Sequence, residues 1–370
     1  MICNAKLAPG EVAMSSHAYP DWEKIRSSSF VSGKNFPRLA EDMPTFFGVP
    51  HAISREDLKG ADVVIIGAPY AAGWGTQYSG VDKSDWLAAP KRVRQQSVRY
   101  RSGYIQDFDL DVFENMRVVD YGDALIPERA NREGTVDLIL EAQAAVEAKV
   151  NDVLDAGGVP IVIGQNSPCG SYAIAKPLSE RTNGAVGMVS LDTHWDAQKI
   201  DRSTMDPRIA GAGNWKDSVY RDLKNFHPRN LVEIGERGML EFSEIVRPYL
   251  AAGAQFVSSW RMRTELGIEG TVKLLPKAFE GTQAVYAHFD LDVMGGAGPA
   301  PGDILGELAE PIGLSDYEVI RLAHETGKLG CNAFSFICIP PGSAVMYRVV
   351  VYTIMYFVAG LSMRKRKAAE

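Results

Sequence analysis

Short apolar runs alternate with longer amphipathic stretches from residue 61 onward. Runs rich in β-branched and aromatic residues, several of them apolar on both faces, are typical of buried parallel strands. The strands predicted in this way cover residues 62–69, 116–123, 159–164, 186–192, 230–237, 254–259, 284–293 and 332–339. Their alternation with helical stretches predicts a parallel sheet between two layers of helices.

Three stretches have the features of helices. Residues 134–158 have helical spacing and end in Gly-Gly, which favours a helix stop. Residues 314–330 begin with Ser315 and Glu318 at the spacing of a capping box. Residues 342–361 are long and apolar enough to be compared with a membrane span, but Arg348 lies inside the run and no second candidate occurs. We therefore expect a buried C-terminal helix and no membrane partner.

The domain organisation follows from where this alternation begins. Residues 1–60 have mixed composition with scattered Pro and Gly, and they predict an irregular N-terminal extension. Residues 61–370 show no linker, repeat or low-complexity segment, so we expect a single domain. The predicted fold class is α/β, a three-layer α/β/α arrangement with a mainly parallel central sheet.

Composition narrows the functional classes. A formal charge of −7 and a pI near 5.5 argue against a nucleic-acid partner. The four cysteines form no paired framework, and the N-terminus lacks a basic segment followed by an apolar run. These features predict a cytoplasmic protein without disulfides.

Candidate chemistry lies at the ends of two predicted strands, where acidic residues and histidines stand at alternate positions. On an extended chain such residues share one face. Buried carboxylates are rarely left unpaired, and mixed imidazole and carboxylate ligands suit Mn, Ni, Zn or Fe. The two sets are Asp192, His194 and Asp196 in SLDTHWDAQ, and His288, Asp290 and Asp292 in HFDLDV.

The order and spacing of several motifs resemble the ureohydrolases, the family of arginase and agmatinase. The matching segments are RVVDYGD (117–123), VPIVIGQNSP (159–168), DTHWD (192–196), VEIGERG (232–238), FDLDV (289–293) and APG (300–302). The resemblance implies an arginase-like fold, a pair of metal ions and hydrolysis of a small guanidine-type substrate by a metal-bound hydroxide. It also implies a trimer or a hexamer.

The same resemblance implies roles for the acidic residues. Asp192 and Asp290 would bridge both metal ions. His194 and Asp292 would complete one metal site, and Asp196 would belong to the other.

Three departures from the family pattern fall on this mechanism. Ser167 stands where the family has its first metal-binding histidine, and a hydroxyl is a poor substitute for imidazole. The segment GAGNWKDS (211–218) lacks the histidine that shuttles protons in the family. Cys338 stands where the family has a glutamate that holds the substrate guanidinium, and a neutral thiol makes no charge-assisted contact with a cation.

Together these losses predict a chain that keeps the fold and loses much of the chemistry. The favoured hypothesis is a non-catalytic or weakly catalytic subunit of a hetero-oligomeric guanidine or biguanide hydrolase, beside a paralogous catalytic subunit. Nickel or manganese would serve the complex, with at most partial occupancy in this chain. The alternatives are an active homo-oligomeric enzyme with a rearranged site, to which His288 or Cys169 would contribute a replacement ligand, and a purely structural scaffold.

An aromatic-rich segment follows the first predicted strand of the domain. Its aromatic side chains suit either a pocket for an alkylated cation or ordinary packing at a surface or oligomer contact. The residues concerned are Tyr70, Trp74, Tyr78 and Trp86.

Overall fold

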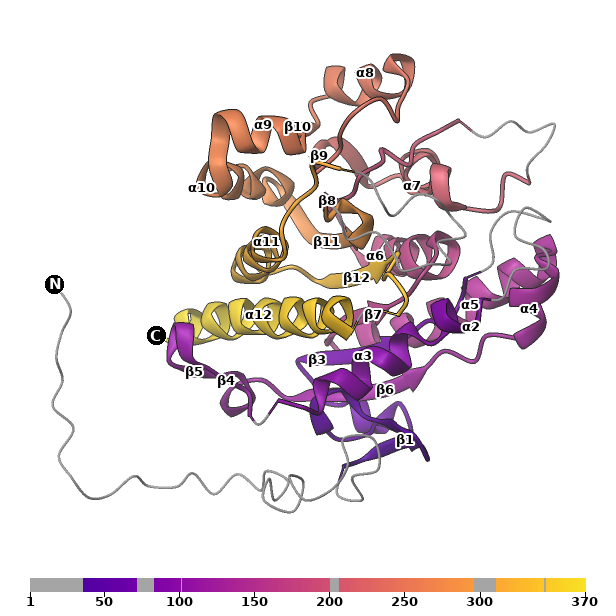
Figure 1. Cartoon of the computed structure of the whole chain (residues 1–370), viewed down its shortest axis with the longest axis vertical. Helices are drawn as coiled ribbons and strands as arrows, with labels where there is room; N and C mark the ends of the chain where they lie inside the picture. Colours follow the sequence, from indigo (N-terminus) through magenta and orange to yellow (C-terminus); the bar gives the residue numbers. More distant parts are fainter. Residues whose placement is uncertain (1–35, 72–82, 101, 200–205, 296–310, 343) are drawn as a thin grey trace, which may run out of the picture.

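The structure is a computed structural model (Figure 1). It describes residues 36–71, 83–100, 102–199, 206–295, 311–342 and 344–370.

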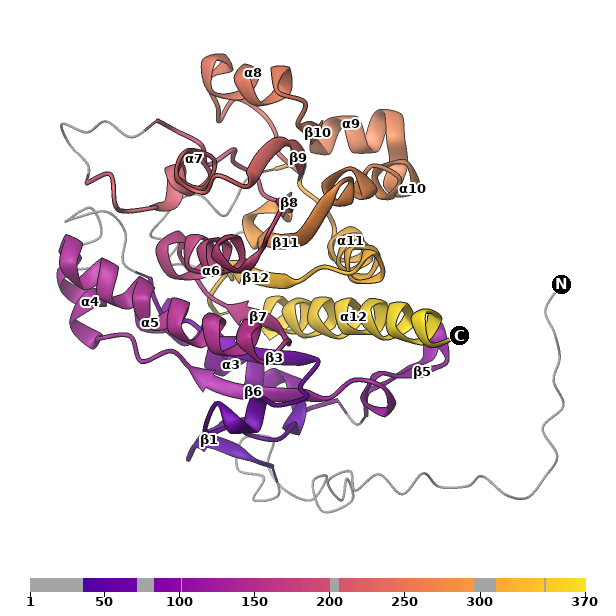
Figure 2. The same ribbon diagram turned by 180° about the vertical axis from the view of Figure 1, so that it is seen from behind.

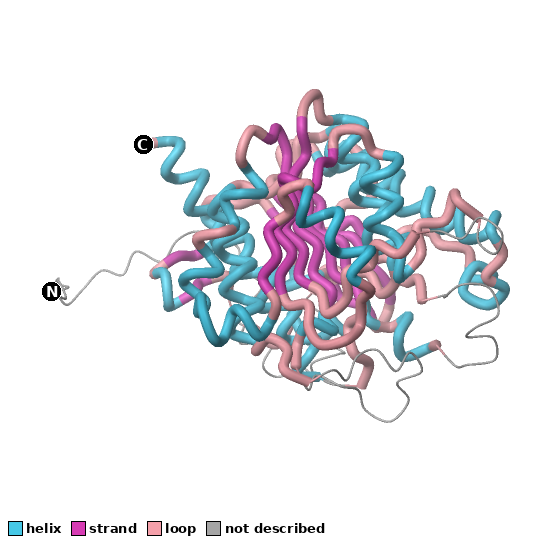
Figure 3. Tube along the Cα trace, turned by 90° about the horizontal axis from the view of Figure 1, so that it is seen from above, coloured by secondary structure: helices cyan, strands magenta, loops and turns pink. Residues whose placement is uncertain are grey.

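A sheet of eight parallel strands forms the centre of the molecule, in the order β10-β9-β8-β11-β12-β7-β3-β6 (Figure 3). Each strand corresponds to one of the apolar runs, so the predicted strands are confirmed. Their bounds are β3 (Val63–Gly67), β6 (Val118–Asp123), β7 (Val159–Ile163), β8 (Ala185–Leu191), β9 (Phe226–Ile234), β10 (Gln255–Val257), β11 (Thr282–Asp290) and β12 (Ala333–Ile337). Two short antiparallel pairs lie outside this sheet, β1 (Arg38–Ala40) with β2 (Met43–Pro44) and β4 (Tyr104–Ile105) with β5 (Leu110–Asp111).

Helices cover both faces of the sheet, with α10, α11 and α12 on one side and α4, α5, α6 and α7 on the other (Figures 1 and 2). This arrangement confirms the predicted three-layer α/β/α fold. The helices are α2 (Ser84–Leu87), α3 (Ala89–Ser97), α4 (Glu128–Glu133), α5 (Val136–Asp155), α6 (Ala173–Arg181), α7 (Trp215–Asp222), α8 (Ser243–Ala251), α9 (Ser259–Arg261), α10 (Gly267–Val272), α11 (Asp316–Leu329) and α12 (Ala344–Ala369).

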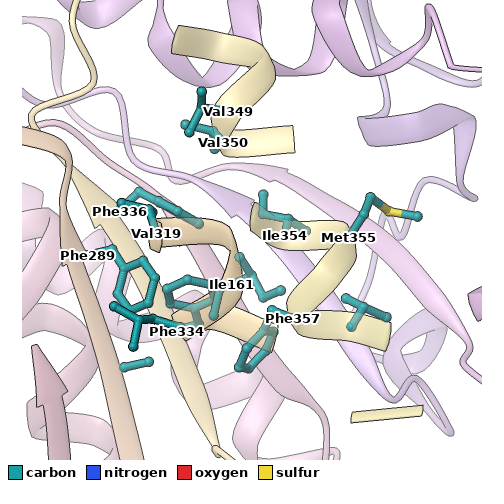
Figure 4. Packing of buried hydrophobic residues seen from close by; sticks show 14 of the residues in the cluster. Ile161, Phe289, Val319, Phe334, Phe336, Val349, Val350, Ile354, Met355 and Phe357 are labelled. Atoms are coloured by element: carbon teal, nitrogen blue, oxygen red, sulfur yellow. The ribbon is translucent and has the colours of Figure 1, made fainter. Parts of the chain in front are cut away.

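The strands are apolar on both faces because each face packs against its own helix layer. In β3, Val63 and Ile65 join the core beneath α11 and α12, while Val64 and Ile66 join the core beneath α5 and α6. Successive side chains of a strand point to opposite faces, so a continuous apolar run fills both cores. Figure 4 shows the first core, where the ring of Phe334 on β12 lies 4.7 Å from that of Phe357 on α12.

The predicted helix signals are also observed. Ser315 and Glu318 form the capping box that begins α11, and Gly330 caps its other end in the left-handed conformation. Among the described residues, α12 is the one helix that is long and apolar enough to cross a membrane, and 72% of its most apolar window is buried. It therefore serves as a core helix, as its pattern predicted.

The N-terminal part is only partly described. Residues 36–60 contain β1, β2 and two single 3-10 turns, Phe46–Gly48 and Glu56–Leu58. The domain boundary predicted at residue 60 stays a prediction, because residues 1–35 lie outside the described ranges.

A close approach of α11 and α12 gives the first testable prediction. A side chain on Gly327 would place its Cβ 2.3 Å from the carbonyl oxygen of Phe357. We expect Gly327→Leu to lower the free energy of unfolding by about 1–3 kcal/mol, because the two helices must move apart. Denaturant unfolding measures the effect. Ala368→Leu on the exposed end of α12 is the control, and equal stability of the two variants would contradict the proposed clash.

Candidate metal centre

The first acidic set lies in a loop that follows β8. The strand ends at Leu191, and the chain bends from Asp192 onward. Asp196 adopts a left-handed conformation with φ +51°. The expectation that Asp192, His194 and Asp196 share one strand face is therefore wrong, because the loop, and not the pleat of a strand, orients these side chains.

The second acidic set straddles the end of β11. Asp290 is the last residue of the strand, and Asp292 lies in a 3-10 turn, Leu291–Val293. The turn is capped by Asp290, whose Oδ1 accepts a hydrogen bond from the amide of Asp292 at 2.9 Å. The prediction that alternate residues share one strand face therefore holds only as far as Asp290, where β11 ends.

The two sets meet because β8 and β11 are neighbours in the sheet. Phe289 pairs with Leu191, so Asp290 and Asp192 leave the same edge side by side. In open α/β sheets, this carboxyl edge is where ligands bind. Three groups have donor atoms that all lie within 4.8 Å of one another, namely Asp192 with His194 and Asp292, Asp192 with Asp196 and Asp290, and Asp290 with Asp292 and Cys338.

His194 is held by both acidic sets. Its Nδ1 lies 2.9 Å from Oδ2 of Asp292, and its amide donates to Oδ1 of Asp192 at 2.8 Å. Burial disfavours the charged imidazole, but the hydrogen bond to Asp292 and the nearby carboxylates outweigh burial and raise the pKa of His194 to about 10. Without a metal ion, His194 is therefore a cation that bridges the two sets.

A lysine supplies a second cation from the start of α7. The Nζ of Lys216 lies 2.8 Å from Oε1 of Glu233 on β9 and 3.2 Å from Oδ2 of Asp192, and all three side chains are fully buried. Ser190 donates a further hydrogen bond to the same oxygen of Glu233 at 2.8 Å. Burial opposes the charge of Lys216, but these carboxylates outweigh it and hold the pKa of the lysine well above its ordinary value.

Burial also determines how the carboxyl groups titrate. It raises the pKa of Asp192 to about 6 and that of Glu233 to about 8, although Lys216 opposes both shifts. Burial and neighbouring carboxylates raise the pKa of Asp196 and of Asp290 well above the ordinary range. So many buried acids cannot all ionise unless cations compensate them.

Ser167 and Cys338 lie at the ends of two other strands. Ser167 precedes a π-helical turn after β7, Pro168–Tyr172, and its buried hydroxyl has no hydrogen-bond partner among the described residues. Cys338 follows β12 in a left-handed conformation with φ +51°, and its thiol belongs to the group with Asp290 and Asp292. The position predicted to have lost a substrate anchor thus retains a group that could bind a metal ion.

The two predicted replacement ligands are not in these groups. His288 is fully buried, and its Nε2 pairs with the hydroxyl of Ser171 at 2.8 Å while its ring lies 4.3 Å from that of Trp215. Cys169 is buried in the apolar core beneath α5 and α6. Among the described cysteines, Cys338 is the one that belongs to these groups.

The aromatic segment is described only at its ends. Tyr70 and Trp86 are both buried. The carbonyl of Trp86 accepts a hydrogen bond from Gln165, which also binds the backbone of Ile339 beyond Cys338. Trp74 and Tyr78 lie outside the described residues, so the predicted pocket remains a prediction.

Sequence reasoning missed the Lys216–Glu233 pair. A glutamate in the apolar strand VEIG was a usable signal, because a buried carboxylate demands a partner. Lys216 gave no such signal, since a lysine in WKDSVYRD has the pattern of an amphipathic helix with an exposed charge.

The donor sets differ in how well they suit a metal ion. Asp192, His194 and Asp292 combine an imidazole with two carboxylates, which suits a transition metal such as Mn or Ni. Asp192, Asp196 and Asp290 contribute carboxylates alone, and two of these already accept hydrogen bonds from Lys216 and from the Trp215 indole. Of the two groups that contain Asp192, the one with His194 is therefore the better fit for a transition-metal ion, because Trp215 and Lys216 already engage oxygens of the other.

Comparisons of the sequence give one consistent result. Residues 61–343 match the sequence model of the arginase family. A formimidoylglutamase of Halobacterium salinarum is 25% identical over 306 residues, which cover 80% of this chain and 86% of the relative. Proclavaminate amidinohydrolase of Streptomyces clavuligerus is 27% identical over 318 residues, which cover 82% of this chain and 87% of the relative.

Solved structures agree on the fold. Proclavaminate amidinohydrolase of Streptomyces clavuligerus superposes with a TM-score of 0.69 at 21% identity, covering 89% of this chain and 99% of that structure. A formiminoglutamase of Trypanosoma cruzi, solved with Mn²⁺, superposes with a TM-score of 0.65 at 21% identity. The superposition covers 87% of this chain and 100% of that structure.

The raised pKa of His194 predicts a pH dependence of stability in a chelator. Folding raises this pKa from 6.5 to about 10, so its contribution is complete below about pH 6.5 and is lost as the pH rises through about 10. We expect the stability advantage of the unsubstituted chain over His194→Asn to be largest near pH 6 and to shrink steadily toward pH 10. Denaturant unfolding in EDTA at several pH values measures it. A difference that does not change with pH would contradict the ion pair with Asp292.

Proposed function

Because the chain belongs to the arginase family, we propose that it is a non-catalytic or weakly catalytic subunit of a hetero-oligomeric amidine hydrolase. The assembly would cleave a C–N bond of a guanidine or biguanide, and the nickel-dependent metformin hydrolase is the type that its pattern of losses resembles best. In this role the chain stabilises an active paralogous subunit. The proposal rests on one observation: Lys216 and Cys338 lie at the carboxylate cluster in segments where the family resemblance places a histidine and a glutamate.

The first departures affect proton transfer and substrate binding. The segment 211–218 contributes Trp215 and Lys216 to the cluster, both buried, and no imidazole that could carry a proton to a leaving group. Cys338 offers a thiol beside Asp290 and Asp292, where the family resemblance places a glutamate. A thiol gives no charge-assisted hydrogen bond to a guanidinium ion, so a cationic substrate loses its anchor.

The remaining departure concerns the nucleophile. A metal ion held by Asp192, His194 and Asp292 would lower the pKa of a bound water molecule. Ser167 offers a hydroxyl where the family resemblance places a metal-binding imidazole, and Lys216 occupies an oxygen of Asp192. The residues of this chain can thus hold one ion, but they lack the groups that would position a substrate beside it.

The assembly and its metal follow from the same proposal. A trimer or hexamer with the paralogous subunit would bind nickel or manganese, mainly in the catalytic subunit, with partial occupancy here. The Trypanosoma cruzi formiminoglutamase with Mn²⁺ supports manganese as a metal of this fold. The described cysteines, Cys169, Cys331 and Cys338, form no disulfide with one another, which supports a reducing, cytoplasmic setting.

A second candidate is an active homo-oligomeric, agmatinase-like ureohydrolase with a rearranged metal site. The observation in its favour is Cys338, whose thiol lies within 4.8 Å of donor oxygens of Asp290 and Asp292. A thiolate there would add a soft ligand that suits nickel or zinc.

Turnover by the isolated chain separates the two candidates. We expect the chain purified alone to hydrolyse metformin, agmatine and related guanidines at least about 100-fold more slowly than its complex with the paralogous subunit, because lost proton-transfer and anchoring groups typically cost this much. Steady-state release of amine or urea measures it, with metal content determined on the same samples.

The paralogous subunit assayed alone is the control. Alone, the paralogous subunit should be less stable or less active than in the complex. Adding this chain should restore its full stability or activity. Turnover by the isolated chain that equals turnover by the complex would overturn the proposal and support the homo-oligomeric enzyme.

A further inference from the structure

The ammonium group of Lys216 lies where it can stand in for a metal ion. It is fully buried, as are Asp192 and Glu233, which it contacts at 3.2 and 2.8 Å. Burying a charge is costly unless it is paired and hydrogen-bonded. A lysine that reaches a cluster of acids under these conditions acts as their counter-ion.

Asp192 is contacted from two sides. Its Oδ1 accepts the amide of His194, which belongs to the group with Asp292. Its other oxygen, Oδ2, accepts the ammonium of Lys216. A carboxylate that bridges two cations presents one oxygen to each. At Oδ2 of Asp192, the cation is the ammonium group of Lys216, which is part of the chain.

The acid next to Asp192 is engaged from the same helix. The indole Nε1 of Trp215 donates to Oδ2 of Asp196 at 3.0 Å, and the amide of Lys216 donates to the Asp196 carbonyl at 3.0 Å. The first two residues of α7 therefore bind both acids that Asp290 would need for a second metal site.

Trp215, the neighbour of Lys216 in α7, is linked through His288 to the turn Pro168–Tyr172. Ser171 of that turn pairs with His288, and the ring of His288 lies 4.3 Å from Trp215. The hydroxyl of Ser167, which precedes this turn, has no hydrogen-bond partner among the described residues. The ammonium thus engages the group of Asp192, Asp196 and Asp290, which contains no imidazole or thiol.

We infer that Lys216, anchored by Glu233, is a built-in cation that replaces one metal ion and leaves a mononuclear site at His194. Glu233 lies on β9 opposite Ser190 of β8 and is hydrogen-bonded by both Ser190 and Lys216, so it fixes the ammonium. This inference concerns the chain itself and does not depend on the proposed partner subunit.

Metal stoichiometry tests this inference. The full-length chain is equilibrated with excess MnCl₂, desalted and analysed for Mn per folded chain. We expect the unsubstituted chain and Ser167→His to retain at most one ion. Lys216→Met combined with Ser167→His should retain about one further ion, because the freed carboxylates then require another cation.

A second variant guards against misfolding caused by an uncompensated acid. Lys216→Met with Glu233→Gln removes one positive and one negative group together, and we expect it to fold and also to bind more Mn than the unsubstituted chain. Lys149→Met is the matched control, since Lys149 is a partly buried lysine above the ring of Tyr121, away from the cluster, and it should leave the metal content unchanged.

Two results would overturn the inference. One is retention of two Mn ions by the unsubstituted chain. The other is a metal content of both folded Lys216 variants that is no higher than that of the unsubstituted chain, which would show that Lys216 does not replace a metal ion. Neither result depends on whether a partner subunit is found.

Discussion

The carboxyl edge of the sheet must balance its buried negative charge. Asp192 and Asp290 leave adjacent strands there, with Asp196 and Asp292 beside them. Ionised acids at this density are stable only beside cations, whether metal ions, an imidazolium or an ammonium. The chain provides two such cations itself, His194 and Lys216, and their contacts fix the loop after β8 and the first turn of α7.

This balance links the arginase-family fold to the proposed loss of catalytic groups. The two cores lie beneath the helices on the two faces of the sheet and extend to the charged edge, where Leu291 joins one core and Trp195 joins the other. Within a hetero-oligomer, such a chain would contribute stability and geometry while its paralogue contributes catalysis.

The sequence was sufficient to predict the fold and part of the site. The strands are runs that are apolar on both faces, and Ser315 with Glu318 marked the start of α11. The prediction that residues at alternate positions share one strand face was wrong at Asp196 and Asp292, because each lies beyond the end of its strand. Lys216 and Glu233 could not be paired from the sequence, since they come from different elements and only the packing of α7 against β9 reveals the pair.

The most direct measurement is anomalous diffraction at the manganese edge from crystals of the unsubstituted chain grown with MnCl₂. We predict one anomalous peak, bound by His194 with Asp192 and Asp292, and the Nζ of Lys216 still within hydrogen-bond distance of Asp192. Two peaks bridged by Asp192 and Asp290, with Lys216 displaced, would contradict the claim that an internal ammonium replaces the second ion.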